Sequence, residues 1–216
     1  MRMTRMFIAV ALTLAVVPAV STAQDTRDFG DSWFWGAKAG VSTVSPTYGD
    51  GQTAATYGVE WLITRTHGAL YISADQANVN LTSSVFDPSA DNNLRDVSVD
   101  KLRSAGFAAL VFPKRFGRFR PYAGLGVSLA FIGKARPIAS GSETEVDDDV
   151  FERVDSRKSM AAVLSMAGVQ AQFNKVALFG QASFIPGNKD FLLSNALGFY
   201  EFGVRYNLAT SRGSFK

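Results

Sequence analysis

Apolar side chains alternate with small or polar ones along most of the chain after Asp31. In residues 121–131, every second position carries an apolar residue: Ala123, Leu125, Val127, Leu129 and Phe131. The last such segment sets Tyr200, Phe202, Val204, Tyr206 and Leu208 against Glu201, Gly203, Arg205 and Asn207. A period of two gives a β-strand one apolar face, whereas a helix needs a period of about 3.6. The sequence therefore predicts an all-β protein.

Eight runs of this kind are found, at residues 32–43, 54–66, 69–79, 97–112, 120–132, 159–173, 175–185 and 196–208. The connections after the second, fourth and sixth runs are short, at residues 66–68, 113–119 and 174–175. The other connections are longer and polar, and the two longest are residues 80–96 and 133–158. Tight turns at one end and long loops at the other predict an eight-stranded antiparallel up-and-down β-barrel.

The width of such a barrel decides which face lies inside. A barrel of this strand number encloses just enough room for side chains to fill it, and the apolar face is too bulky to fit. The opposite face is smaller, because it carries Gly36, Gly40, Gly58, Gly106, Gly124, Gly126, Gly168 and Gly203. We therefore predict a transmembrane barrel whose apolar face meets lipid, with aromatic girdles formed by Trp33, Trp35, Tyr57, Phe131, Phe173 and Tyr206. The alternative is a soluble, lipocalin-like carrier barrel, periplasmic or secreted, with its apolar face inside.

Charged side chains on the predicted inner face have compensating signs. A dry interior tolerates charges when they are paired and hydrogen-bonded. We predict a structural ion-pair core that plugs the lumen, made of Lys38, Glu60, Arg103, Glu201 and Arg205, with Asp75 as a further acid. A charged path for protons or ions, which would make the barrel a narrow channel, is the alternative interpretation.

The first 23 residues have the pattern of a cleaved signal peptide. Arg2 and Arg5 precede a mainly apolar segment of about 15 residues, too short for a membrane anchor, which needs roughly 20. A short lead at residues 24–31, the barrel at 32–208 and a tail at 209–216 complete the predicted organisation. Without Arg2 and Arg5, the excess of 22 basic over 19 acidic residues nearly disappears, which argues against nucleic-acid binding.

The signal peptide, the alternating strands and the strand start PYAGLG at residues 121–126 resemble small bacterial outer-membrane barrels of the OmpA/OmpX/OmpW type, over most of residues 28–208. In the last strand, Glu201, Gly203, Tyr206 and Leu208 match the signal that barrel-assembly machinery recognises in this class. The resemblance implies the cell outer membrane as location, and periplasmic chaperones, assembly machinery and outer-membrane lipid as partners. We expect a monomer without a peptidoglycan-binding domain.

Candidates for catalysis or metal binding are few. His67 is the one histidine of the chain and lies in a short turn, where it is poorly placed as a base for hydrolysis. The longest loop contains a cluster of acidic residues: Glu143, Glu145, Asp147, Asp148, Asp149 and Glu152. Such carboxylates can hold a divalent cation, but their spacing fits no EF-hand. A solvated loop is the simpler interpretation. Basic side chains at one short turn are suited to anchoring on lipid headgroups; they are Lys114, Arg115, Arg118 and Arg120. We predict no catalytic residue, no cofactor and no metal site.

These features predict a non-enzymatic outer-membrane barrel with a plugged polar lumen, which has a structural or surface-binding role through its long extracellular loops. A lipid-modifying enzyme on the same fold is less favoured, because the chain lacks a suitably placed base. The sequence names no extracellular ligand.

Overall fold

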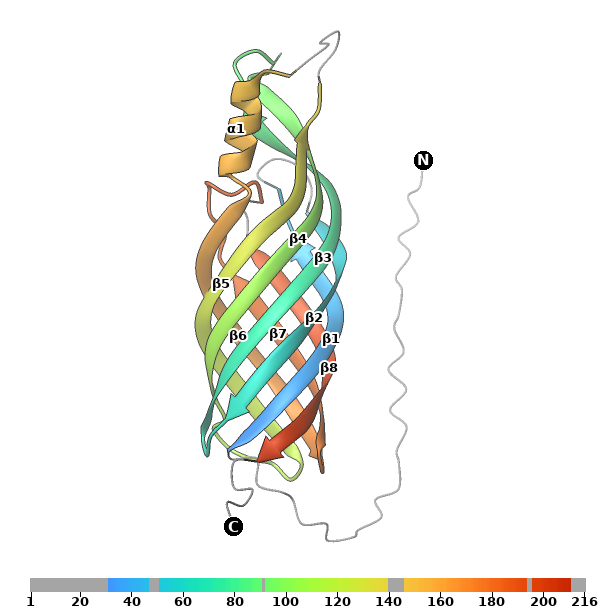
Figure 1. The fold of residues 1–216 in the computed structure, drawn as a ribbon, viewed down its shortest axis with the longest axis vertical. Coiled ribbons are helices and arrows are strands. Elements are labelled where there is room, and N and C mark those ends of the chain that lie inside the picture. The colour runs from blue at the N-terminus through green and yellow to red at the C-terminus, as the bar shows by residue number, and fades with distance from the viewer. Residues whose placement is uncertain (1–30, 47–50, 91, 140–145, 194–195, 211–216) are drawn as a thin grey trace, which may run out of the picture.

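The computed structural model describes residues 31–46, 51–90, 92–139, 146–193 and 196–210. These residues form eight β-strands and one α-helix: β1 (Ser32–Val44), β2 (Gln52–Thr64), β3 (Gly68–Phe86), β4 (Leu94–Val111), β5 (Phe119–Pro137), α1 (Asp148–Ser156), β6 (Ser159–Phe173), β7 (Val176–Ile185) and β8 (Leu197–Thr210). Each strand pairs antiparallel with the next, and β8 pairs with β1 to close the barrel (Figure 1). The predicted eight-stranded antiparallel barrel is confirmed.

In the part of the barrel where all eight strands pair, the apolar face of the strands is on the outside. Along β5, Leu125 and Val127 are exposed while Tyr122 and Ala130 are buried, as the alternation predicts. All six aromatic residues predicted for the girdles lie on the outer surface. A soluble carrier would hold these side chains inside, so that alternative does not fit. Among the described residues, no helix is long and apolar enough to cross a membrane.

The closure between β1 and β8 requires a glycine. Gly40 pairs with Glu201, and a Cβ atom at this position would lie 2.0 Å from the carbonyl oxygen of Tyr200. Any larger residue would push the two strands apart and disrupt the ladder that closes the barrel.

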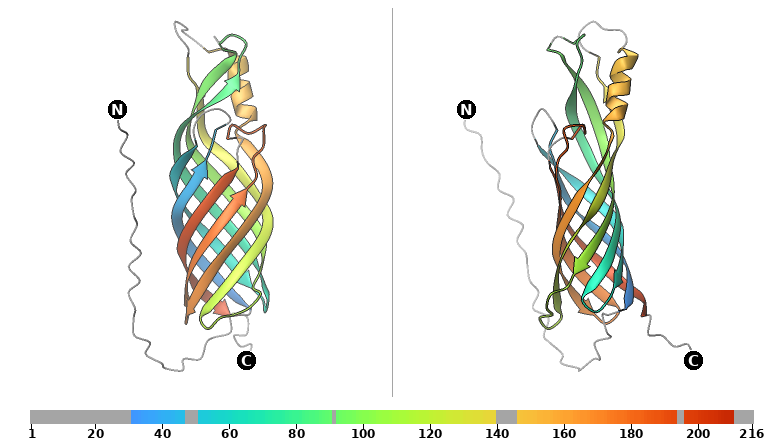
Figure 2. Two further views of the ribbon diagram at one scale, coloured as in Figure 1. Left: turned by 180° about the vertical axis from the view of Figure 1, so that it is seen from behind. Right: turned by 90° about the vertical axis from the view of Figure 1, so that its left-hand side faces the viewer.

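The long-loop end differs most from the sequence prediction. β3 continues to Phe86 and β4 begins at Leu94, so most of the predicted loop 80–96 is a β-hairpin. Its polar residues suggested a loop, but Asn80 and Thr82 face outward while Val79, Leu81 and Val85 are buried. Side chains still alternate between the two faces, but here the apolar ones lie inside. In the predicted loop 133–158, β5 runs on to Pro137 and residues 148–156 form α1. Figure 2 shows β3, β4, β5 and α1 rising beyond the other strands.

A buried ion pair stabilises the tip of this extension. Arg95 Nε lies 2.7 Å from Asp87 Oδ2, and both side chains are almost completely buried. Ser89 donates two hydrogen bonds to Asp87 Oδ1, from its hydroxyl at 2.6 Å and from its backbone N–H at 2.9 Å. The hydrogen bonds from Ser89, together with Arg95, outweigh burial and lower the pKa of Asp87 to about 2. Asp87 is therefore ionised, and it fixes the connection between β3 and β4.

The helix α1 packs against this extension with its apolar side. Val150 and Val154 are buried in the same apolar cluster as Val85 and Val97. Arg153 Nη1 donates a hydrogen bond of 2.9 Å to the carbonyl oxygen of Phe86. The long-loop end is thus a folded structure in which strands support a helix.

Candidate functional site in the barrel interior

Arg205 lies at the centre of the lower part of the barrel, toward the short turns. Its side chain is completely buried and forms an ion pair through Nε with Glu60 Oε1. Nη1 donates a 2.6 Å hydrogen bond to Gln170 Oε1, and Nη2 donates one of 3.3 Å to the hydroxyl of Tyr122. The guanidinium also lies 3.9 Å from the ring centre of Phe179. One cation from β8 thereby links β2, β5, β6 and β7 across the lumen.

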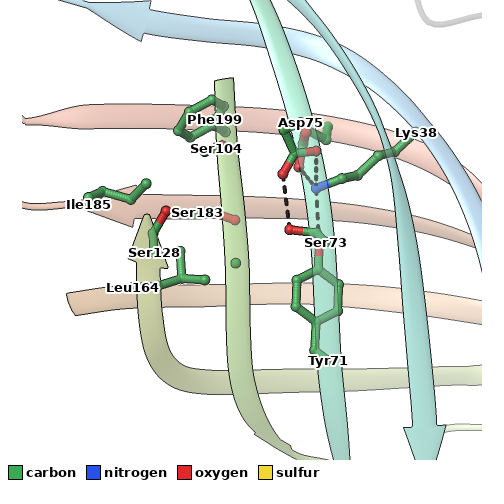
Figure 3. A pocket seen from close by; sticks show the side chains of 12 residues that line it. Lys38, Tyr71, Ser73, Asp75, Ser104, Ser128, Leu164, Ser183, Ile185 and Phe199 are labelled. Carbon is green, nitrogen blue, oxygen red and sulfur yellow. Dashed lines mark hydrogen bonds and ion pairs between the residues drawn. The ribbon is translucent and has the colours of Figure 1, made fainter. Parts of the chain in front are cut away.

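A second cluster surrounds Lys38, nearer the long-loop end. Its Nζ lies 2.8 Å from Asp75 Oδ1 and 2.9 Å from Glu201 Oε2; Lys38 and Glu201 are buried, and Asp75 is nearly so. Lys38 Nζ also donates a 2.9 Å hydrogen bond to the hydroxyl of Tyr71. Figure 3 shows Lys38, Asp75, Ser73 and Tyr71 converging in the lumen. This cluster joins β1, β3 and β8.

Gln181 connects the two clusters. Its Nε2 donates to Glu201 Oε2 at 3.0 Å and to the hydroxyl of Tyr71 at 3.1 Å. Its Oε1 accepts a 3.0 Å hydrogen bond from the Tyr122 hydroxyl. A single polar network therefore runs along the barrel axis from Arg205 to Lys38.

The network carries more carboxylates than cations. Glu60, Asp75 and Glu201 face Lys38 and Arg205 among the described interior residues. Glu60 Oε2 and Glu201 Oε1 are buried and accept no hydrogen bond from the described groups. A cavity of about 20 Å³ beside Lys38 and Glu201 is lined by Ser73, Ser104, Ser128 and Ser183 (Figure 3). That volume is room for about one water molecule, and its lining is polar enough to hold one.

Apolar side chains cover the network on the long-loop side. Leu164, Ile185 and Phe199 line the same cavity and belong to the apolar core. The segment between β7 and β8 contributes three further buried residues, Phe191, Leu192 and Leu193. Ser83 Oγ donates a 2.6 Å hydrogen bond to the carbonyl oxygen of Leu192, which fixes this segment to β3.

Known structures share this architecture, although sequence comparisons find nothing: no protein-family model and no curated protein matches the chain. The crystal structure of Neisserial surface protein A superposes with a TM-score of 0.56 at 16% identity, covering 82% of this chain and 97% of that one. Ail, the attachment invasion locus protein of Yersinia pestis, gives a TM-score of 0.51 at 11% identity, covering 83% and 99%. Ail in complex with the heparin analogue sucrose octasulfate gives 0.50 at 14% identity, again covering 83% and 99%.

This is the fold of the OmpA/OmpX-like outer-membrane barrels. In lipid, a closed barrel is one of the two structures that satisfy every backbone hydrogen bond internally. The outward apolar side chains described above supply the surface that lipid requires. Fold and surface together are those of a barrel that spans a membrane, and the proteins that share the fold are outer-membrane proteins.

Four of the five residues predicted for the lumen core lie inside the barrel, and the structure brings them together in pairs. Glu60 contacts Arg205, and Lys38 contacts Glu201. Asp75, named only as a further acid, shares Lys38 with Glu201. The four residues of the predicted assembly signal lie on β8, where Glu201 is buried while Tyr206 and Leu208 are exposed.

The prediction that Arg103 lies in the lumen is wrong. Arg103 is exposed on the outer surface of β4, between Gln76 of β3 and Phe131 of β5 in the strand register. It lies three positions from the inward-facing Gly106, and an odd separation along a strand puts two side chains on opposite faces. The alternation itself contained this information.

The remaining candidates lie outside the lumen. His67 is exposed in the turn between β2 and β3. Glu143 and Glu145 fall outside the described residues, and so does the predicted signal peptide; Asp148, Asp149 and Glu152 lie on α1 rather than in a loop. In the described part of the chain, no three acidic or histidine side chains converge as metal ligands would. Lys114 and Arg118 flank the turn between β4 and β5, and each lies near an aromatic ring.

Sequence reasoning missed the neutral members of the network. Tyr71, Gln170 and Gln181 are buried and bridge the charges. Their positions on the inner face follow from strand alternation, so that signal was present. Their contacts were not predictable, because these depend on how the strands are staggered around the barrel.

Proposed function

We propose that this outer-membrane barrel has no enzymatic activity, that its lumen is plugged, and that it acts structurally or by binding at the cell surface through its long-loop end. The observation that carries the proposal is the buried network from Arg205 to Lys38. Buried charges that are paired on several sides hold their positions rigidly, since separating them would leave a charge without a partner. The same side chains occupy the space that a permeating ion would need.

The absence of enzymatic activity is supported by the placement of the polar groups. The charged residues of the interior are paired with one another, and His67 is in an exposed turn at the far end. A hydrolytic site needs a nucleophile, a base and an orienting acid within hydrogen-bond reach. The described residues do not bring His67 into such an arrangement with a serine and a carboxylate.

Surface binding is supported by the rigidity of the long-loop end. Exposed side chains at this end are held in fixed positions by the strand pairing of β3, β4 and β5, by the Asp87–Arg95 pair and by α1. A binding surface requires such fixed positions. The similar structures are named as a surface protein and an attachment protein, and Ail is seen with a heparin analogue. By analogy of fold, we propose that the ligand of this chain binds at the same end.

Three further features belong to the same proposal. Residues 1–23 are removed as a signal peptide, and Glu201, Gly203, Tyr206 and Leu208 are read by the barrel-assembly machinery after delivery by periplasmic chaperones. The protein acts as a monomer.

Purified protein in planar bilayers is expected to show no large, steady ion conductance, because the Arg205 and Lys38 clusters fill the lumen. Single-channel recording at high salt measures this directly. Regular porin-sized openings would contradict the plugged lumen and favour the channel interpretation.

An epitope tag inserted after Asp147, at the start of α1, is expected to bind antibody on intact cells. A tag inserted beside His67 is expected to bind only after the outer membrane is permeabilised, because that turn is at the opposite end of the barrel. Flow cytometry of intact and permeabilised cells makes the comparison, and the reverse labelling would refute the orientation.

A further inference from the structure

Four basic side chains gather on the outer wall near the long-loop end, where β4 and β5 leave the membrane. Lys101 and Lys134 are cross-strand partners, Arg103 pairs with Phe131, and Arg136 pairs with Ser98. We call Lys101, Arg103, Lys134 and Arg136 the cationic patch. Like charges directly opposite each other on neighbouring strands are destabilising, so this arrangement needs an explanation beyond folding.

Within the described residues, the cationic patch has no ionic partner. In the described part of the chain, the ion pairs within 4.0 Å involve none of these four residues. Asp100 is exposed on the same stretch of β4 and takes part in none of these pairs. Arg103 donates only from Nε, to Gln76 Oε1 at 3.0 Å. The terminal nitrogens of its guanidinium remain available to an anion.

An apolar groove of about 650 Å³ lies directly beside Arg103 on the wall formed by β1 to β5. Small side chains, Ala37, Ala74 and Ala105, form part of its lining, and Tyr57, Val59 and Phe131 are larger side chains around them. The register places Val59, Ala74 and Ala105 in one row across three strands, two residues from the row of Tyr57, Gln76 and Arg103. The groove therefore runs along the lipid-facing wall and meets the cationic patch at Arg103.

We propose that the groove and the cationic patch bind one phosphorylated, acylated lipid of the bilayer leaflet on the long-loop side. The groove holds an acyl chain, and the patch binds the phosphate of the headgroup. Arginine is suited to phosphate, because its planar guanidinium donates two parallel hydrogen bonds, and lysines at a membrane surface attract anionic headgroups. A lipid is the expected ligand because this wall of the barrel faces the membrane. The proposal therefore rests on the placement of the barrel in a membrane.

Native mass spectrometry of the full chain, released from detergent micelles, tests this with phosphatidic acid as the probe and phosphatidylcholine as the zwitterionic comparison. We expect one phosphatidic acid to remain bound under conditions that remove phosphatidylcholine. Replacing Lys101, Lys134 and Arg136 by glutamine should weaken its binding at least tenfold. The matched control replaces Arg65, Lys175 and Lys189 by glutamine, three exposed residues in other connections, which removes the same charge away from the cationic patch and should leave binding unchanged. Equal weakening in both variants would overturn the proposal, because it would reveal general charge attraction.

A second pair of variants tests the groove. Ala74→Phe fills it, whereas Ala161→Phe adds the same ring in the same row of the barrel wall, beyond Leu129 and outside the groove. We expect only Ala74→Phe to reduce lipid binding, and circular dichroism checks that both barrels fold. If Ala74→Phe has no effect and glycerol phosphate displaces the lipid at equal concentration, the patch is a site for soluble anions and the lipid proposal fails. The measurement is made in detergent, so its outcome is independent of whether the lumen conducts.

Discussion

Glu60→Leu is expected to destabilise the barrel by about 3–5 kcal/mol, the range observed when one member of a buried ion pair is removed. Arg205 is completely buried, and Glu60 is the acid with which it forms its ion pair. Gln170 and Tyr122 would still accept hydrogen bonds from the guanidinium, but they carry no negative charge. Urea unfolding of the protein refolded in lipid vesicles measures the loss.

A second substitution identifies the cause. Arg205→Met in the Glu60→Leu background is expected to recover much of the stability, because a buried pair replaced on both sides by apolar residues of similar size is often nearly neutral. The same Arg205→Met change should not rescue Glu201→Leu, since Glu201 pairs with Lys38. If Arg205→Met rescues both variants equally, or if Glu60→Leu costs less than about 1 kcal/mol, the pairing described here is wrong.

The barrel and its inside-outside arrangement were predictable because they depend on a local property. Alternation along a strand fixes which side chains share a face, and the volume of a narrow lumen decides which face is inside. Val127 was therefore assigned to the outside, and Glu201 to the inside, without knowledge of any long-range contact.

The pairing inside the lumen was not predictable in the same way. Glu60 and Arg205 are 145 residues apart in the sequence. They meet because the stagger of β1, β2 and β8 places both of them opposite Gly36 of β1. The signs of the inner residues indicate that pairs form, but not which acid meets which cation. The long-loop ends of strands β3, β4 and β5 were not predicted as β-structure for another reason. Their polar residues are typical of turns, and only pairing with a neighbouring strand makes them β-structure.

Val127→Arg is expected to cost about 2–4 kcal/mol, the range for a cationic side chain near the middle of the bilayer on the outer face of a barrel. Val127 is 53% exposed, and its strand partners are the outward-facing Phe107 and Val163. An arginine at this position would contact hydrocarbon, and its strand partners Phe107 and Val163 offer no acid with which it could pair. Urea unfolding in vesicles again measures the change, and Val127→Leu should be nearly neutral.

Depth in the membrane provides the matched control. Ser159 is exposed on the outside of β6 and pairs with Phe131, four residues further along β5 toward the long-loop end. Ser159→Arg therefore introduces the same side chain near the interface, where the cost falls to about 0–1 kcal/mol. The native Arg103 lies in the same row, because it is the partner of Phe131 on the neighbouring strand β4. An arginine is tolerated at this level because headgroups and water are within its reach. If Val127→Arg and Ser159→Arg cost the same, the outer wall does not span hydrocarbon at Val127, and the assignment of the lipid-facing surface is wrong.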